Sequence, residues 1–256
     1  MKLVAAPKWI KPTEWSVGTR CSRTPVRVFF MEIGKMIEKR PTSEVMNVDC
    51  LEYMRSLPDK HFDLCIADPP YGLDKKSSMG GPKLQNRAFS KGAIHDWDTR
   101  PDAEVFDEIR RISKHQVIWG GNYFPLPPTR CFICWDKVQP WSNFSQCEMA
   151  WTSFDYPAKM FRFDNRTGKK IHPTQKPIEL YSYVLKTFAH EGDKIFDPFL
   201  GSGSSRIAAY KLGFDFVGCE IDEEYFRLSE ERFQRECHGI VKSSSEGTTL
   251  QQLSLF

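Results

Sequence analysis

The sequence predicts an α/β fold built on a doubly wound, mostly parallel sheet. Short apolar runs rich in β-branched and aromatic residues alternate with segments of helical period over residues 41–238. Strands that alternate with helices in this way usually form a parallel sheet whose helices cover its faces. The chain has 256 residues, of which 40% are hydrophobic and 27% charged, so it is long enough for one well-buried domain.

A local sequence pattern predicts each strand and each helix. Apolar, β-prone runs predict strands at residues 44–49, 62–67, 116–121, 131–135, 147–154, 194–197 and 215–220. Helical periods predict helices at residues 51–57, 101–114, 177–191, 204–212 and 223–237. Pro101 and Pro177 stand in first helical turns, where proline is tolerated, and Gly192 closes the helix that Pro177 opens.

The segments at the two ends lack a sustained period. We expect residues 1–40 to form an N-terminal extension and residues 239–256 to form a flexible tail, because the tail begins with many Ser, Thr and Gly residues. No apolar run reaches the roughly 18 residues of a membrane span, and no apolar stretch typical of a secretory signal opens the sequence. We therefore expect a cytoplasmic protein.

Eight cysteines raise the question of disulfides or a zinc site. Only Cys131 and Cys134 have the spacing of metal ligands, and no second such pair or spaced histidines follow them. Their surroundings, "CFICW", read as a strand. We expect reduced, buried thiols and no metal site.

The strand predicted over residues 62–67 ends at an acid. Because Pro69 and Pro70 cannot continue the hydrogen bonding of a sheet, the strand must stop at Asp68. The prolines stiffen the chain after the acid, and we expect Tyr71 to be held out at the rim. The alternative is an ordinary strand exit with Asp68 as a turn former, and these residues alone do not decide between the two.

A second unit later in the chain has the features of a nucleoside site. A strand ends at Asp197, and Gly201 and Gly203 follow in the turn before a helix. The next strand ends at Glu220, which can accept hydrogen bonds from both ribose hydroxyls of an adenosine group. Arg206 replaces the third glycine of the dinucleotide fingerprint, which favours a nucleoside cofactor without phosphates. The alternative is a glycine turn that only starts a helix.

Three motifs occur in a fixed order along the chain. They are "DPPYG" at residues 68–72, "HPTQKP" at 172–177 and "DPFLGSGSS" at 197–205. In these motifs and their order, over most of residues 45–238, the sequence resembles the β class of DNA amino-methyltransferases. The resemblance implies a Rossmann-like methyltransferase fold, S-adenosylmethionine as cofactor and double-stranded DNA as substrate.

The resemblance also implies the reaction. Members of the family transfer the methyl group to an exocyclic amino nitrogen. The acid-first turn, which has Asp68 here, is associated with N6 of adenine, and a serine-first turn with N4 of cytosine. We therefore expect an adenine-N6 methyltransferase. The alternatives are a cytosine-N4 enzyme and, from another class, a catalytically silent adaptor that binds nucleic acid.

Individual roles follow from the same resemblance. The catalytic residues are Asp68, Pro69, Pro70 and Tyr71. The residues expected at the cofactor are Asp49, Thr174, Lys176, Asp197, Phe199, Gly201, Gly203 and Glu220. Thr174 and Lys176 suit the methionine carboxylate, although a capped helix entry explains that segment better when it is taken alone. Asp49 has the alternative role of capping the helix that begins near Leu51.

Two basic segments flank the expected site. Their basic residues are Lys75, Lys76, Lys83, Arg87 and Lys91 in the first, and Lys159, Arg162, Arg166, Lys169 and Lys170 in the second. We expect these residues to contact DNA phosphates, and residues 154–171 to take the target-recognition role that this position has in the family. Charged runs that are only solvated faces are the alternative.

Three of the last five residues of the printed sequence, Leu253, Leu255 and Phe256, are apolar and follow a polar stretch. The five residues are Gln252, Leu253, Ser254, Leu255 and Phe256, and they resemble the pentapeptide by which bacterial proteins dock on the replicative sliding clamp. We therefore expect the clamp as a partner besides DNA, in the cytoplasm of a bacterium or a phage-infected cell. A frayed end that packs back onto the domain is the alternative.

Overall fold

The computed structural model describes residues 40–72, 99–141, 145–164, 170–172, 174–241 and 251–252. The chain divides into two compact units, residues 1–39 and residues 40–256. Every described residue belongs to the second unit. The predicted N-terminal extension, apart from Arg40, and most of the predicted tail lie outside the described residues.

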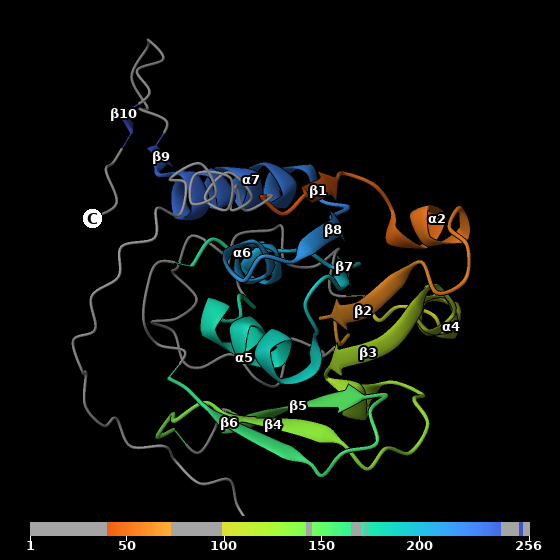
Figure 1. The fold of residues 1–256 in the computed structure, drawn as a ribbon. Coiled ribbons are helices and arrows are strands. Elements are labelled where there is room, and N and C mark those ends of the chain that lie inside the picture. The colour runs from red at the N-terminus through yellow and green to blue at the C-terminus, as the bar shows by residue number, and fades with distance from the viewer. Residues whose placement is uncertain are drawn as a thin grey trace, which may run out of the picture. The chain divides into compact units, whose positions relative to one another are not determined.

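One sheet of eight strands organises the described part of the second unit (Figure 1). In spatial order its strands are β1 (Ser43–Met46), β8 (Asp215–Cys219), β7 (Lys194–Asp197), β2 (Phe62–Ala67), β3 (Ser113–Trp119), β5 (Cys147–Thr152), β4 (Phe132–Asp136) and β6 (Lys159–Arg162). Within this sheet only β5 runs against the others. The expected doubly wound, mostly parallel sheet is confirmed. A separate antiparallel pair joins β9 (Ile240–Val241) to β10 (Gln251–Gln252).

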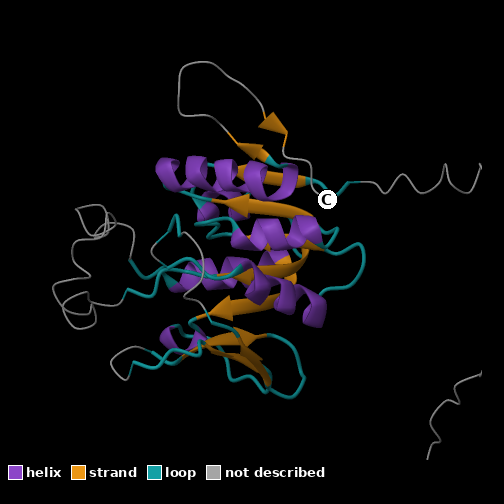
Figure 2. Cartoon of the chain, turned by 90° about the vertical axis from the view of Figure 1, so that its left-hand side faces the viewer, coloured by secondary structure: helices purple, strands orange, loops and turns teal. Residues whose placement is uncertain are grey.

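Helices cover both faces of this sheet. They are α2 (Cys50–Arg55), α4 (Ala103–Ile112), α5 (Ile178–Phe188), α6 (Ser204–Lys211) and α7 (Glu223–His238), with a short 3-10 helix, η2 (Gly121–Tyr123). Helices α2 and α4 lie on one face, and α5 and α6 on the other, with α7 beside α6 (Figure 1). Figure 2 looks onto the face that α5 and α6 cover. Within the described part of the chain, every helix is too short or too polar to cross a lipid bilayer.

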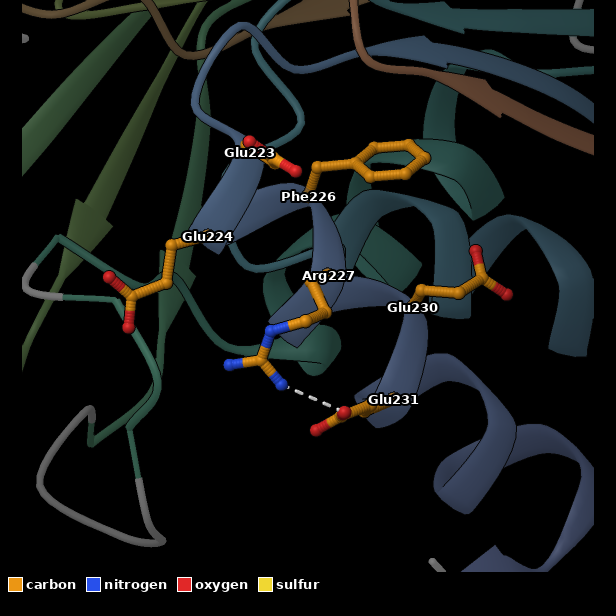
Figure 3. A pocket seen from close by; sticks show the side chains of 6 residues that line it. All are labelled: Glu223, Glu224, Phe226, Arg227, Glu230 and Glu231. Atoms are coloured by element: carbon orange, nitrogen blue, oxygen red, sulfur yellow. Dashed lines mark hydrogen bonds and ion pairs between the residues drawn. The ribbon is translucent and has the colours of Figure 1, made fainter.

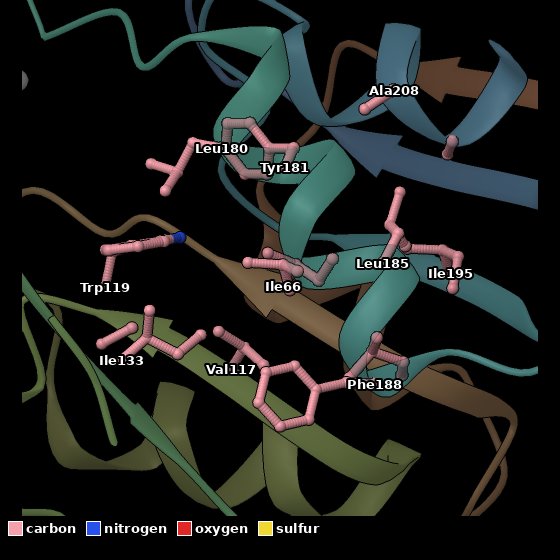
Figure 4. Close-up of a cluster of buried hydrophobic side chains, with 14 of the residues drawn as sticks. Ile66, Val117, Trp119, Ile133, Leu180, Tyr181, Leu185, Phe188, Ile195 and Ala208 are labelled. Carbon is pink, nitrogen blue, oxygen red and sulfur yellow. The ribbon is translucent and has the colours of Figure 1, made fainter. Parts of the chain in front are cut away.

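Each face of the sheet has its own hydrophobic core, because successive side chains of a strand point to opposite faces. In β2, Leu64 and Ile66 pack with residues of α5 and α6, whereas Cys65 and Ala67 pack with residues of α2 and α4. Figure 4 shows the first of these cores, in which Ile66 lies among side chains of α5. Strand β2 is therefore buried from both sides, which fixes the position of the turn that follows it.

The segment predicted as a target-recognition insert is partly a strand. Lys159–Arg162 forms β6, which pairs in parallel with β4 at the edge of the sheet. These four residues of the second basic segment were not among the predicted strands. Phe161 explains the difference, because its ring packs on Tyr183 of α5 with centroids 4.8 Å apart and so extends the core beyond β4.

The cysteines in the described part of the chain are free thiols. The predicted strand around Cys131 and Cys134 is present as β4. The prediction of burial holds for Cys65, Cys131 and Cys219, but Cys147, at the start of β5, is exposed.

Arg206 lies where a dinucleotide-binding chain would have its third glycine. Its guanidinium donates to the hydroxyl of Ser43, pairs with Glu230 at 2.6 Å and lies 3.7 Å from the centroid of the Phe233 ring. The side chain is buried and holds α6 against β1 and α7. Arginine at this position therefore serves helix packing.

A matched pair of phenylalanine substitutions tests the inner core. Phe62 is fully buried and stacks on Phe196 with centroids 4.6 Å apart, whereas Phe132 is 37% exposed on β4. We expect Phe62→Ala to lower the free energy of unfolding by about 3–5 kcal/mol, because it leaves a cavity between the sheet and α2. We expect Phe132→Ala to lower it by about 1 kcal/mol or less. Urea unfolding followed by circular dichroism measures both, and equal losses would contradict the assignment of the core.

Candidate active site at the carboxyl edge of the sheet

The topology brings the acids predicted from sequence to one edge of the sheet. Strand β2 lies between β7 and β3 and runs parallel to both, so Asp68 follows β2 at the same edge where Asp197 ends β7. Glu220 follows β8, the next strand, at this edge. After β2 the chain moves outward through β3, and it later returns to the other side of β2 as β7. Such a switch point is where open α/β sheets bind ligands.

Asp68 is held by two side chains. Its Oδ1 atom accepts hydrogen bonds from the Lys176 ammonium at 2.5 Å and from the Tyr71 hydroxyl at 3.0 Å. Burial raises the pKa of Asp68, and the charge of Lys176 opposes that rise. The structure therefore surrounds this carboxylate with donors that favour its ionised form.

Lys176 lies at the turn that follows β2. Its side chain is only 4% exposed, and its ammonium contacts Asp68, the Tyr71 hydroxyl at 3.2 Å and Glu148 at 3.2 Å. Burial acts to lower the pKa of Lys176, but Asp68 and Glu148 together hold it above its ordinary value. The sequence assigned Lys176 to a cofactor carboxylate, and here the ammonium is directed to the carboxylate of Asp68 instead.

The sequence predicted that Tyr71 is held out at the rim, but its side chain turns inward. Its ring stacks on Tyr123 with centroids 5.0 Å apart, and the Lys176 ammonium lies 5.5 Å from its centroid on a cation–π contact. A Cβ atom at Gly120 would lie 2.3 Å from the Tyr71 ring. Glycine at this position, which has a φ of +66°, therefore makes room for the ring.

Glu148 is a site residue that sequence reasoning missed. It lies near the start of β5, and because β5 is antiparallel, that start is at the edge where the parallel strands end. Burial acts to raise the pKa of Glu148, but ion pairs with Lys176 and Lys137 lower it to about 2. The residue is therefore a partly buried carboxylate that stays ionised. The residues around Lys137 and Glu148, "DKVQ" and "CEMA", match no catalytic or binding motif. Only the fold shows that Glu148 lies at the site.

The glycine turn between β7 and α6 is built around two acids. Asp197 accepts from the amide of Phe199 at 2.9 Å and from the hydroxyl of Ser205 at 2.5 Å, and burial raises its pKa to about 7. Glu220 accepts from the amide of Gly201 at 2.7 Å. The second glycine, Gly203, has a φ of +72° and stands directly before α6. These contacts fix the shape of the turn.

The remaining residues predicted at the cofactor have local partners. Asp49 caps α2, since its Oδ1 atom accepts from the amides of Leu51 and Glu52. This is the alternative role that the sequence offered for it. The hydroxyl of Thr174 lies 3.0 Å from Nδ1 of His172, a buried histidine whose pKa burial and Lys176 lower to about 4.

Most of the predicted DNA contacts lie outside the described residues. These are Lys75, Lys76, Lys83, Arg87, Lys91, Arg166 and Lys169. Lys159 and Arg162 lie in β6 an odd number of positions apart, so they point to opposite faces of the sheet. Arg162 is exposed and pairs with Asp136 at 3.3 Å. Of the clamp-like pentapeptide, only Gln252 is described, in β10, and Leu253, Ser254, Leu255 and Phe256 are not.

A surface pocket of about 580 Å³ lies on α7 (Figure 3). It is lined by residues of that helix alone, namely Glu223, Glu224, Phe226, Arg227, Glu230 and Glu231. With four carboxylates and one guanidinium, this face of α7 repels phosphates and is unsuited to DNA. The carboxyl edge of the sheet remains the candidate site.

Sequence comparisons place the chain near known methyltransferases. The profile of the N6_N4_Mtase family, described as DNA methylase, matches residues 136–231. The Type II methyltransferase M.HinfI of Haemophilus influenzae is 24% identical in a match that covers 74% of this chain and 68% of that protein. The Type II methyltransferase M2.MboI of Moraxella bovis is 24% identical in a match that covers 80% of this chain and 92% of that protein. These matches support an amino-methyltransferase.

Two solved structures share the fold. A Thermus thermophilus protein described as a DNA modification methylase, in complex with S-adenosyl-L-methionine, matches with a TM-score of 0.50 and 20% identity over 76% of this chain and 94% of that one. The PvuII DNA methyltransferase, which is cytosine-N4-specific, matches with a TM-score of 0.53 and 17% identity over 74% of this chain and 86% of that one. The chain therefore has the fold of S-adenosylmethionine-dependent methyltransferases.

Two glycines with positive φ provide a test of how tightly Tyr71 is packed. At Gly192 a Cβ atom meets nothing within 4 Å, so Gly192→Ala should cost only the backbone strain, about 1–2 kcal/mol of unfolding free energy. Gly120→Ala adds a clash with the Tyr71 ring and should cost about 1–3 kcal/mol more. Urea unfolding of the two variants gives the difference. Equal losses would mean that the Tyr71 ring moves aside without cost.

Proposed function

We propose that this chain is an S-adenosylmethionine-dependent methyltransferase that modifies N6 of adenine in double-stranded DNA. The observation that carries the proposal is the carboxylate of Asp68, which the Lys176 ammonium holds at the carboxyl edge of the sheet, one strand away from the glycine turn after β7. The family profile and the Type II relatives support the DNA substrate.

The residues of the glycine turn fit the cofactor. A Cβ atom added at Gly201 would be in van der Waals contact with the His172 ring at 3.9 Å, so the glycine turn lies against the "HPTQKP" segment. Glu220 keeps the turn in place through the Gly201 amide and stands where a ribose hydroxyl can be bound. Asp68, Asp197 and Glu220 make this edge acidic, which suits a cationic sulfonium. When bound, S-adenosylmethionine would supply an activated methyl group.

The chemistry of the target explains the catalytic turn. The lone pair of an adenine amino nitrogen is delocalised into the ring, so the nitrogen is a poor nucleophile. Asp68 and the backbone carbonyl of Pro69 can each accept one amino hydrogen and so turn the lone pair out of the ring plane. As the nitrogen is methylated it loses one proton, which the Asp68 carboxylate can receive. The two prolines hold these acceptors in position, and orientation alone supplies about 7–11 kcal/mol in favourable cases.

Adenine is proposed over cytosine because the turn begins with an acid at Asp68. The cytosine-N4-specific PvuII enzyme shares the fold at 17% identity, which leaves the target base open. N4 of cytosine is the alternative, and the same two acceptors suit it. A catalytically silent adaptor is disfavoured, because a binding module has no need of a buried carboxylate paired with a buried ammonium.

Substitution at Asp68 tests the proposal. We expect Asp68→Asn to lower methyl transfer by about 100-fold or more, because a neutral amide cannot take up the amino proton. The affinity for S-adenosylmethionine, measured by calorimetry, should stay close to that of wild type. Asp63→Asn is the matched control, because Asp63 stands at the other end of β2 and pairs with Lys114.

The readout is the modified base itself. DNA from an expressing strain is digested to nucleosides and analysed by mass spectrometry, which separates N6-methyladenine from N4-methylcytosine. N4-methylcytosine would overturn the choice of adenine, and the absence of both would overturn the proposed function.

We also propose a bacterial sliding clamp as a partner, on the basis of the sequence from Gln252 to Phe256. An apolar pentapeptide at the end of a polar stretch can dock in a pocket and raise the local concentration of the enzyme at newly replicated DNA. In a calorimetric titration with purified clamp, we expect removal of residues 252–256 to abolish binding. Gln251→Ala, just outside the pentapeptide, should bind like the intact protein. Equal binding with and without residues 252–256 would end this proposal.

A further inference from the structure

Four charged side chains form a continuous chain at the proposed active site. Lys137 pairs with Glu148, Glu148 lies 3.2 Å from Lys176, and Lys176 lies 2.5 Å from Asp68. The charges alternate and sum to zero. Each of the four side chains is at most 22% exposed, so water does little to stabilise any of them. The four residues lie in or next to β4, β5, α5 and β2, so the row of charges runs along the carboxyl edge from β4 to β2.

The pairing poses a problem for catalysis. The Oδ1 atom of Asp68 is occupied by the Lys176 ammonium and the Tyr71 hydroxyl. A target amino group needs this carboxylate as an acceptor, so the ammonium must release it at least in part. A buried ammonium without a counter-charge destabilises the folded protein strongly. A second carboxylate within reach of Lys176 removes that cost.

We infer that Glu148 is a positioning residue for methyl transfer: it takes over the Lys176 ammonium when Asp68 accepts the amino group of the target base. Two contacts support this role. The distance of 3.2 Å from Lys176 means that a small shift of the ammonium exchanges one carboxylate for the other. Lys137 compensates the charge of Glu148, so Glu148 is ionised before the exchange. The inference rests on the proposed function, because it gives Asp68 the role of acceptor.

The inference predicts a specific kinetic effect of Glu148→Gln. Without the second carboxylate, Lys176 stays on Asp68, and we expect kcat to fall about 10- to 100-fold, the range that small misplacements at a reacting centre produce. The KM for S-adenosylmethionine should change little. Glu148→Asp keeps the charge and should recover part of kcat.

The pH profile of kcat distinguishes this role from a merely structural one. The groups that face Asp68 are Lys176, Glu148, Tyr71, Tyr181 and Asp197. Among them, the negative charge of Glu148 raises the pKa of Asp68. Since Asp68 acts in its ionised form, activity rises with pH through its pKa. Glu148→Gln removes the negative charge, so the acidic limb of the profile should move to lower pH.

The experiment compares wild type, Glu148→Gln, Glu148→Asp and a control under the same conditions on a DNA duplex. Glu230→Gln is the control, because Glu230 pairs with the buried Arg206 on α6, away from the catalytic turn. It should keep the wild-type kcat and pH profile. Melting temperatures show which variants are folded, and if Glu148→Gln is unfolded, Glu148→Asp provides the test through its reduced kcat.

The outcomes separate the two hypotheses. A folded Glu148→Gln variant with wild-type kcat and an unmoved acidic limb would overturn the role of Glu148. A folded Glu148→Asp variant with wild-type kcat would do the same if the Gln variant is unfolded. Failure of the wild-type protein to methylate any base overturns the proposed function instead, because that result does not depend on Glu148.

Discussion

The ion pair between Lys176 and Asp68 is the contact around which the site is arranged. The two residues are 108 positions apart, and both side chains are largely buried, at 4% and 15% exposed. Two charges removed from water stabilise a protein only when their geometry is good and their remaining hydrogen-bonding groups are satisfied. The Tyr71 hydroxyl donates a hydrogen bond to Asp68, and Glu148, itself paired with Lys137, adds a second negative charge beside Lys176. These contacts therefore fix three segments relative to one another: the turn after β2, the residues before α5 and the start of β5.

The acids at this edge differ in pKa because their surroundings differ. Asp197 has only an amide and a hydroxyl as donors, and burial raises its pKa to about 7. Glu148 is more exposed, at 22% against 1%, and pairs with two lysines, and its pKa is about 2. Asp68 lies between these cases, since burial raises its pKa while a single lysine opposes the rise. A carboxylate of this kind can hold and release a proton more readily than one fixed by two cations.

Local patterns were sufficient to predict every strand of the eight-stranded sheet except β6, together with the acids that end β2, β7 and β8. Prolines after Asp68 and glycines after Asp197 mark strand exits through backbone chemistry that acts within a few residues. The contact between Lys176 and Asp68 could not be predicted in this way. The two residues are 108 positions apart and meet only because the chain comes back to β2 when β7 pairs with it. Asp49 shows the converse, since its capping role is local and the sequence offered it as an alternative. The inward turn of Tyr71 depends on Gly120 in another strand exit, and so it too was out of reach.

Strand direction explains why Glu148 is at this site at all. The parallel strands deliver only their last residues to the carboxyl edge, as β2, β7 and β8 do. An antiparallel strand delivers its first residues there, and β5 is the strand of this sheet that runs against the rest in the described part of the chain. Its pairing with β3 places Ala150 opposite Trp119, so Glu148 projects two residues further toward the edge. The reversed strand thus adds a carboxylate within reach of Lys176 to the acids that follow or end β2, β7 and β8.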